Sequence, residues 1–191
     1  MGTIEELLSA YEDAETLAEA ESALDALAGQ APTDEHHIGD LYDQLADLAV
    51  EEDDFSLAVR AQRRAIELGC EHLDIAREML AWYLLKEGQR EAGEAAFSQL
   101  QAERGADFAL LLTIGNARLD SGDASGALDA FDDALALAKR SDDPDAIYEA
   151  RAERRGCREE MRLEPDDDDL EVRRVAIGRG SAGARESKGA R

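Results

Sequence analysis

Three stretches of this chain repeat one another at a spacing of 34 to 35 residues. The turns show the spacing best, because Gly122 follows Gly88 by 34 residues and Gly88 follows Asp53 by 35. In the third copy an apolar helical face containing Leu111 precedes the turn, and a second face containing Phe131 follows it. A regular period in this range is typical of stacked helical hairpins and argues against a single closed core.

The composition also favours helices. Aromatic residues make up only 5% of the chain, and Ala and Leu supply most of the apolar side chains. Such a composition suits helices that pack closely through small side chains, whereas a β-sandwich favours β-branched and aromatic residues. The three prolines, Pro32, Pro144 and Pro165, stand where we place helix ends in any case. We therefore expect an all-α protein.

We predict six helices in three hairpins that are joined by short turns. Their ranges are 37–51, 55–69, 74–87, 91–104, 107–120 and 124–140. Gly88 and Gly122 suit the left-handed residue that ends a helix, because glycine has no Cβ to strain there. Asp53 occupies the same place in the first hairpin and suits it less well.

The N-terminal stretch keeps the helical spacing of its apolar residues as far as Gly29. Thr3 followed by Glu6 has the pattern of a capping box, which predicts a helix start there. Residues 3–28 form either one long helix or two short ones that break near Asp13, and both alternatives stay open.

A further helix is expected at the C-terminal side of the repeats. Asp143 predicts its start as a cap, and Pro144 fits the first helical position. One narrow seam runs along an otherwise charged surface, which suits a terminal helix that shields the last repeat. The seam consists of Ile147, Ala150, Arg154, Cys157 and Met161.

The expected organisation has five parts. They are an N-terminal helical extension (1–30), a linker (31–38), three repeats within 39–140 (39–73, 74–107 and 108–140), a capping helix (144–163) and an acidic-then-basic tail (164–191). The tail contains Pro165, four consecutive Asp and many Gly, Ser and Arg residues, with nothing to bury. We expect it to be disordered.

The formal net charge is -24, and it is unevenly distributed. No Lys or Arg precedes Arg60, whereas 17 Asp and Glu do, and residues 172–191 hold six Lys or Arg against the single acid Glu186. An acidic body repels nucleic acid and anionic membranes and attracts basic proteins. Alternatively, the charge keeps the protein solvated in a high-salt cytoplasm. The basic tail either folds back on the acidic N-terminal half, where it competes with ligands, or is an unstructured end.

The best repeat carries a set of small and large residues at fixed positions. They are Leu111, Ile114-Gly115, Gly122-Asp123, Ala127, Phe131 and Ala134. This pattern resembles that of the tetratricopeptide repeat family over about 39–140. The second copy departs from it at Gly93, where Ala is usual, and at Leu100, and the first has Gln62 where an aromatic residue belongs. The resemblance implies a right-handed α-solenoid of about three hairpins that binds peptides or proteins.

In that family the first helix of each hairpin lines a concave groove, and the resemblance implies the same here. The implied groove residues are Asp40, Asp43, Asp47, Val50 and Glu51 from the first repeat, Trp82, Leu85 and Lys86 from the second, and Leu112, Asn116 and Leu119 from the third. Some members hold a C-terminal carboxylate with cations at these positions. Because Asp43 and Asp47 stand there instead, a carboxylate clamp is not expected. Trp82 is either an apolar anchor for the partner or a core residue, whereas Phe131 is expected to be structural.

No motif for catalysis, a cofactor or a metal stands out. Cys70 and His72, even with the histidines of the linker, match no zinc pattern, and neither cysteine has the context of a nucleophile. The run from Asp166 to Asp169 lacks the alternate spacing and closing Glu of a calcium loop, so we interpret it as solvated charge. We therefore expect no enzymatic activity, no cofactor and no metal.

These features favour a non-catalytic protein-protein interaction module, an adaptor or assembly scaffold that binds an extended or helical protein segment in its groove. The alternative is an acidic chaperone or decoy that sequesters basic proteins. The expected partner is a basic or apolar protein segment, without nucleic acid or membrane, and a homodimer through the terminal helices stays open. The absence of a secretory signal pattern and of a disulfide framework favours the cytoplasm.

Overall fold

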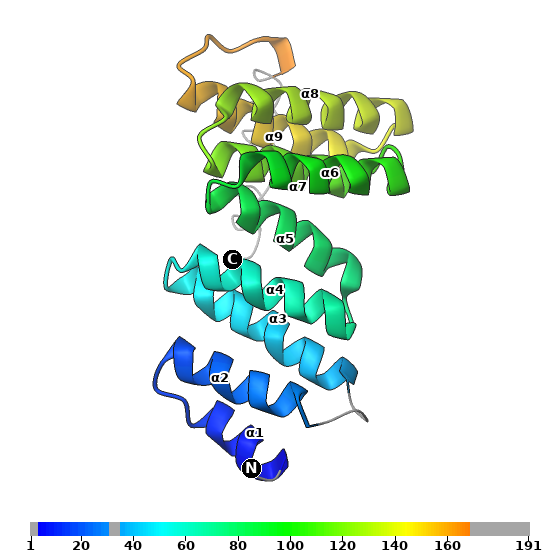
Figure 1. The fold of residues 1–191 in the computed structure, drawn as a ribbon. Coiled ribbons are helices and arrows are strands. Elements are labelled where there is room, and N and C mark those ends of the chain that lie inside the picture. Colours follow the sequence, from blue (N-terminus) through cyan, green and yellow to red (C-terminus); the bar gives the residue numbers. More distant parts are fainter. Residues whose placement is uncertain (1–3, 31–34, 169–191) are drawn as a thin grey trace, which may run out of the picture. The chain divides into compact units, whose positions relative to one another are not determined.

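The computed structural model describes residues 4–30 and 35–168. In these ranges the chain forms nine α-helices and no strand (Figure 1). The helices are α1 (Ile4–Glu12), α2 (Leu17–Ala28), α3 (Glu35–Glu51), α4 (Phe55–Leu68), α5 (Leu73–Lys86), α6 (Arg90–Arg104), α7 (Phe108–Asp120), α8 (Ala124–Ser141) and α9 (Pro144–Glu160). The all-α prediction is confirmed for this part of the chain. None of these helices has both the length and the apolar character needed to cross a membrane.

The chain divides into two compact units, Met1–Glu103 and Arg104–Arg191. In the first unit each helix from α1 to α4 packs against the next one along the chain, and α1 to α4 lie side by side in that order (Figure 1). Gly93 brings α6 against α5. In the second unit α8 packs against both α7 and α9. Packing between consecutive helices is compatible with an α-solenoid.

The turns between α3 and α4, between α5 and α6, and between α7 and α8, which are the three expected hairpins, share one backbone geometry. Asp53, Gly88 and Gly122 have φ values of 58°, 88° and 84°. In each turn the next residue donates its N–H to the carbonyl oxygen five residues earlier, over 2.8 Å, and the three pairs are Asp54 to Ala49, Gln89 to Leu84 and Asp123 to Arg118. This is the hydrogen bond of a Schellman helix end. The left-handed turns expected at the two glycines are confirmed, and Asp53 adopts the same conformation despite its Cβ.

The helix ends agree with the predicted ones to within about three residues. The largest difference is at α9, which ends at Glu160, because Arg162 turns into the left-handed region with a φ of 56°. Short acidic side chains cap the starts: the carboxylates of Asp107 and Asp123 accept hydrogen bonds from the backbone N–H groups of Leu110 and Gly126 at 3.1 and 3.0 Å. Such caps satisfy N–H groups that have no partner inside the helix.

The N-terminal stretch forms two helices, which settles the alternative that the sequence left open. The helices break between Glu12 and Leu17, and a capping box starts the second one. The hydroxyl of Thr16 accepts from the N–H of Glu19 at 3.3 Å, and the Glu19 carboxylate accepts from the N–H of Thr16 at 3.2 Å. The capping box expected at Thr3 lies outside the described residues.

Small residues set how closely paired helices approach. A Cβ at Gly115 in α7 would lie 2.3 Å from the ring of Phe131 in α8, which is fully buried as expected. In the second hairpin the glycine is on the other helix: a Cβ at Gly93 in α6 would lie 2.6 Å from the Leu85 side chain of α5. In the first hairpin Gln62 is buried at the position of the aromatic residue. Its side-chain amide donates a hydrogen bond to the carboxylate of Asp43. Each hairpin thus fills the space between its helices in a different way.

Arg154 of α9 is buried, with 7% of its surface exposed. Its guanidinium forms ion pairs with the carboxylates of Asp132 in α8 and Asp166 beyond the end of α9. A buried guanidinium needs such partners, because an uncompensated buried charge is strongly unfavourable. The seam of α9 therefore contains an ionic contact in addition to its apolar residues.

Asp168, two residues after Asp166, is also bound by basic side chains. The carboxylate of Asp168 accepts hydrogen bonds from Lys139 of α8 and Arg151 of α9, both at 2.9 Å. The interpretation of the acidic run as solvated charge is therefore wrong for Asp166 and Asp168, because basic side chains of two helices bind them. Both residues belong to the first part of the expected tail, 164–191. Residues 169–191, with the basic segment, lie outside the described residues.

Candidate functional site

The groove residues implied by the family resemblance differ in how far they are buried. Leu85 and Leu112 are buried, with 5% and 8% of their surface exposed, so their expected position on an open surface is wrong. Leu85 fills the space that Gly93 leaves empty, and Leu112 belongs to the apolar core of the second unit. The residues that are exposed or half-buried are Asp40, Asp43, Asp47, Val50, Glu51, Trp82, Lys86, Asn116 and Leu119.

Three acidic side chains along α3 bind neighbouring segments of the same unit. The carboxylate of Asp40 accepts a hydrogen bond from the backbone N–H of Glu71 at 2.8 Å. Asp43 accepts one from Gln62, and Asp47 accepts one from the hydroxyl of Tyr83 in α5 at 3.2 Å. These contacts connect α3 to α4, to α5 and to the turn before α5.

The environment of Asp47 differs from that of an ordinary surface carboxylate. Partial desolvation raises the pKa of Asp47; the hydrogen bond from Tyr83 opposes this, and the nearby Asp43 and Glu51 carboxylates add to it. Trp82, on the same helix as Tyr83, is half-buried. This position lies between the two alternatives that the sequence left open for Trp82, an exposed anchor and a core residue.

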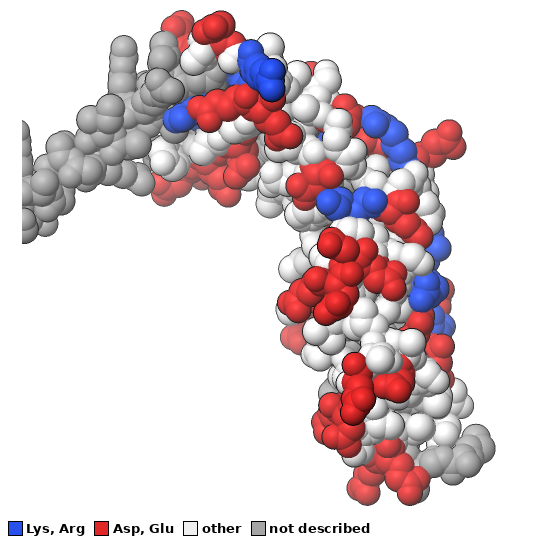
Figure 2. Space-filling model, turned by 90° about the vertical axis from the view of Figure 1, so that its left-hand side faces the viewer, with Lys and Arg blue, Asp and Glu red and all other residues white. Residues whose placement is uncertain are grey.

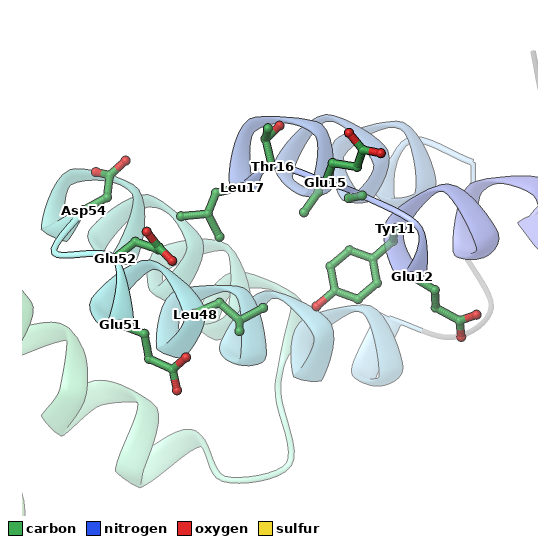
Figure 3. A pocket seen from close by; sticks show the side chains of 11 residues that line it. Tyr11, Glu12, Glu15, Thr16, Leu17, Leu48, Glu51, Glu52 and Asp54 are labelled. Atoms are coloured by element: carbon green, nitrogen blue, oxygen red, sulfur yellow. The ribbon is translucent and has the colours of Figure 1, made fainter.

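A separate hollow lies in the first unit, between the α1–α2 hairpin and the end of α3 (Figure 3). We call it the α1–α3 cleft. Its volume is about 690 Å³, and its eleven lining residues are Tyr11, Glu12, Ala14, Glu15, Thr16, Leu17, Ala20, Leu48, Glu51, Glu52 and Asp54. Five of them are carboxylates and none is Lys or Arg.

The floor of the cleft is apolar. Figure 3 shows Tyr11 and Leu17 from the α1–α2 side and Leu48 from α3 turned toward the space between these elements. Leu48 stands one turn before the end of α3, and 44% of its surface is exposed. The hydroxyl of Tyr11 donates to the backbone carbonyl of Leu41 at 3.5 Å, and burial raises the pKa of this phenol. This contact connects α1 to α3 beneath the cleft.

The carboxylates lie around that floor on two sides. Glu12 and Glu15 come from the α1–α2 turn, whereas Glu51, Glu52 and Asp54 come from the end of α3 and the turn to α4 (Figure 3). Because α1, α2 and α3 contain no Lys or Arg, these helices contribute neither residue to balance the carboxylates. Figure 2 shows Asp and Glu gathered in the lower part of the view, where α1 to α3 lie.

The first cations of the sequence bind other side chains, and the charge of Arg60 also interacts with that of Asp54 at the cleft. Arg60 of α4 binds the Glu21 carboxylate of α2 through two of its nitrogens, at 2.9 and 3.0 Å. Arg64 pairs with Glu67 on its own helix at 2.8 Å and lies 5.8 Å from the centre of the Tyr42 ring. Neither arginine lines the cleft.

Sequence reasoning found Glu51 but missed the rest of the cleft. The hollow depends on how the α1–α2 hairpin packs against α3, and those segments are separated by a linker whose course the periodicity does not predict. One sequence signal was available. Glu12, Asp13 and Glu15 form one acidic group at the expected break, and Glu51 to Asp54 form a second acidic group at a predicted helix end.

Comparison with known proteins adds no identity. A scan against models of protein families finds no match for this sequence, and a search of curated proteins finds no match either.

Proposed function

We propose that this chain is a cytoplasmic, non-catalytic protein-interaction module of the tetratricopeptide type. In this proposal three hairpins form a right-handed α-solenoid, α1 and α2 precede it, and α9 caps its end. The three turns with one shared hydrogen-bond geometry and the spacing of 34 to 35 residues support this reading. Its role is that of an adaptor or assembly scaffold that holds a segment of another protein.

The α1–α3 cleft is the proposed binding site, and its apolar floor under a rim of carboxylates is the observation that carries the proposal. Its volume of about 690 Å³ falls within the range of roughly 300–1,000 Å³ that is typical of ligand sites. Leu48 offers apolar surface that a partner would remove from water, which favours association. The remaining exposed and half-buried positions of α3 and α5, including Trp82, offer a second surface in the same unit.

Site-specific photo-crosslinking in the native host tests the proposal without assuming the chemistry of the partner. Benzoylphenylalanine is placed at Leu48 in the cleft, at Trp82 on α5, and at Ile75 as a control, because Ile75 is 57% exposed and does not line the cleft. A defined host protein that crosslinks at Leu48 and not at Ile75 is the expected result.

The three positions separate the outcomes. A protein that crosslinks at Trp82 alone would move the binding surface to α5 and leave the cleft without a role. Equal crosslinking at all three positions, or at none, would contradict an interaction module with a defined site.

A decoy for basic proteins is the second candidate, because the first 59 residues hold 17 acids and no Lys or Arg. Such a decoy binds through net charge, so its affinity falls steeply with salt, and many basic proteins compete equally. An adaptor that buries Leu48 binds a small set of partners and keeps part of its affinity at high salt. Titration of a captured partner across ionic strengths distinguishes the two.

A further inference from the structure

We infer that the α1–α3 cleft binds a short basic protein segment in which cationic side chains stand on both sides of one apolar side chain. This inference rests on the proposed function and names the chemistry of the partner. The arrangement of the floor, the rim and the helix ends around the cleft supports it.

The floor offers an apolar surface between two groups of carboxylates. Tyr11, Leu17 and Leu48 approach it from three helices, and the two acidic groups lie to either side of it (Figure 3). A segment that places a leucine-sized side chain on this floor carries its neighbouring residues toward the rims. Cations in those neighbouring positions meet the carboxylates of Glu12 and Glu15 on one side and those of Glu51 and Glu52 on the other.

The helix ends add to the negative field. The C-terminal ends of α1 and α3 both border the cleft, at Glu12 and Glu51, and neither helix has a basic residue in its last turn. A helix C-terminus carries partial negative charge, so carboxylates placed there are unfavourable unless a cation is nearby. Such a pair of acidic helix ends around one hollow favours a cationic ligand.

The positive helix ends at the cleft are already neutralised. The N-terminus of α2 is covered by the capping box of Thr16 and Glu19. The N-terminus of α4 is covered by Asp54, whose carboxylate accepts from the N–H of Leu57 at 2.9 Å. An anionic ligand therefore finds no uncapped helix N-terminus at the cleft. A cation meets the C-terminal ends of α1 and α3 and the carboxylates of Glu12, Glu15, Glu51 and Glu52.

The spacing of the acids favours several separate cations over a single metal ion. In the described part of the chain no three His, Cys, Asp or Glu side chains come together closely enough to hold a metal ion. The charges of the ligand must therefore be distributed, as they are along a basic peptide. The apolar floor distinguishes such a peptide from a ligand that is held by charge alone.

Fluorescence anisotropy with synthetic peptides and the full-length chain tests the inference. The probe is a labelled Arg-Lys-Leu-Lys-Arg peptide, and two matched peptides replace its Leu with Ser or its four cations with Gln. Protein variants are Glu51→Gln/Glu52→Gln and Leu48→Ser. Asp129→Asn/Asp133→Asn is the control, because it removes the same charge from exposed positions of α8 that do not line the cleft. Circular dichroism confirms that each variant folds.

We expect the probe to bind the wild type and the control variant with affinities within about twofold of each other, since remote exposed charges are largely screened. Loss of Glu51 and Glu52 is expected to weaken binding by about three- to thirtyfold, from two exposed charge pairs. Exchange of the probe's Leu for Ser, or of Leu48 for Ser, is expected to weaken it by about five- to tenfold, from lost apolar burial.

Each other outcome overturns the inference. Equal weakening by the α8 control would show binding through net charge, and equal binding of the Gln peptide would show a purely apolar site. Displacement by spermidine together with indifference to the Leu exchange would show a polyamine site. If no peptide binds while Leu48 still crosslinks to a host protein, the inference about basic partners fails and the interaction module stands. If neither Leu48 nor Trp82 crosslinks to a host protein, both fail.

Discussion

The close approach of Gly115 to Phe131 supports a prediction that can be worked out from the structure. The change is Gly115→Ala in α7, which adds a Cβ 2.3 Å from the buried ring of Phe131 in α8. Carbon atoms do not approach one another so closely, so the ring must leave its place or the two helices must separate.

Two effects of opposite sign decide the magnitude. Overpacking a close-packed core costs about 1–3 kcal/mol, and a fully buried ring has little freedom to move, which favours the upper half of that range. Alanine is better than glycine inside a helix by about 1 kcal/mol. We therefore expect Gly115→Ala to lower the free energy of unfolding by about 1–2 kcal/mol. Truncation of the ring itself, in Phe131→Ala, is expected to cost about 3–5 kcal/mol.

Urea denaturation followed by circular dichroism measures these differences. Gly156→Ala in α9 is the matched control, because its added Cβ meets no atom within 4 Å, and it is expected to gain about 1 kcal/mol. The pair Gly115→Ala/Phe131→Leu should be more stable than the two single changes would sum to, by about 1 kcal/mol or more. If Gly115→Ala is as stable as the wild type, or the two positions show no coupling, the close contact does not limit the packing of α7 on α8.

Four further outcomes are expected. Glu51→Gln and Glu52→Gln should each stabilise the first unit by about 0.3–1 kcal/mol at low salt, because both carboxylates stand at the negative end of α3; thermal melts that show a loss would contradict this. Burial alone would raise the pKa of Asp168, but its two basic partners lower it below the usual value. Its contribution to stability is then present above about pH 4 and lost as the pH falls further. The difference in urea midpoint between wild type and Asp168→Asn should therefore be found at neutral pH and shrink as the pH falls below about 4; a constant difference would refute the ion pair. Trp82→Ala should release a defined set of captured host proteins if the α5 surface takes part in binding, and an unchanged set would assign Trp82 to packing. Removal of residues 172–191 should raise the affinity for a basic partner if the basic tail competes for the same surface, and an unchanged or lower affinity would exclude that competition.

The helices were predictable because local chemistry marks their ends. Gly88 and Gly122 ended helices as expected, and Asp143 with Pro144 started one. These signals act within a few residues of the chain, so no knowledge of the packing is needed to read them. The break between α1 and α2 stayed open because Thr16 and Glu19 lie very close to the next apolar run. So short a separation does not exclude one continuous helix.

Burial was harder to predict than helix position. Leu85 was expected on an open surface, but the missing side chain at Gly93 on the facing helix creates a space that Leu85 fills. The departure from the usual Ala at Gly93 was visible in the sequence. Its effect on a residue eight positions earlier depends on the register of two helices, and this register is a property of the packing.

The candidate site was predicted least well, for a related reason. Only Glu51 was named both among the expected groove residues and among the lining of the α1–α3 cleft. The cleft combines chain segments on both sides of a linker, and neither acidic group looks unusual in a chain with a net charge of -24. In the same way, the acidic run after α9 looked solvated because its basic partners lie 12 to 29 residues away in the sequence.

The ion pair between Arg154 and Asp166 determines how far the chain can be shortened without loss of a buried contact. A chain cut after Leu163, where the helical pattern of α9 stops, would lose Asp166 and Asp168, and with Asp166 one of the carboxylates that bind the buried Arg154 guanidinium. A chain that continues through Asp168 keeps the acidic groups that hold the end of α9 against α8. A variant shortened for protein production or crystallisation should therefore keep residues 164–168, which lie beyond the point where the helical periodicity stops.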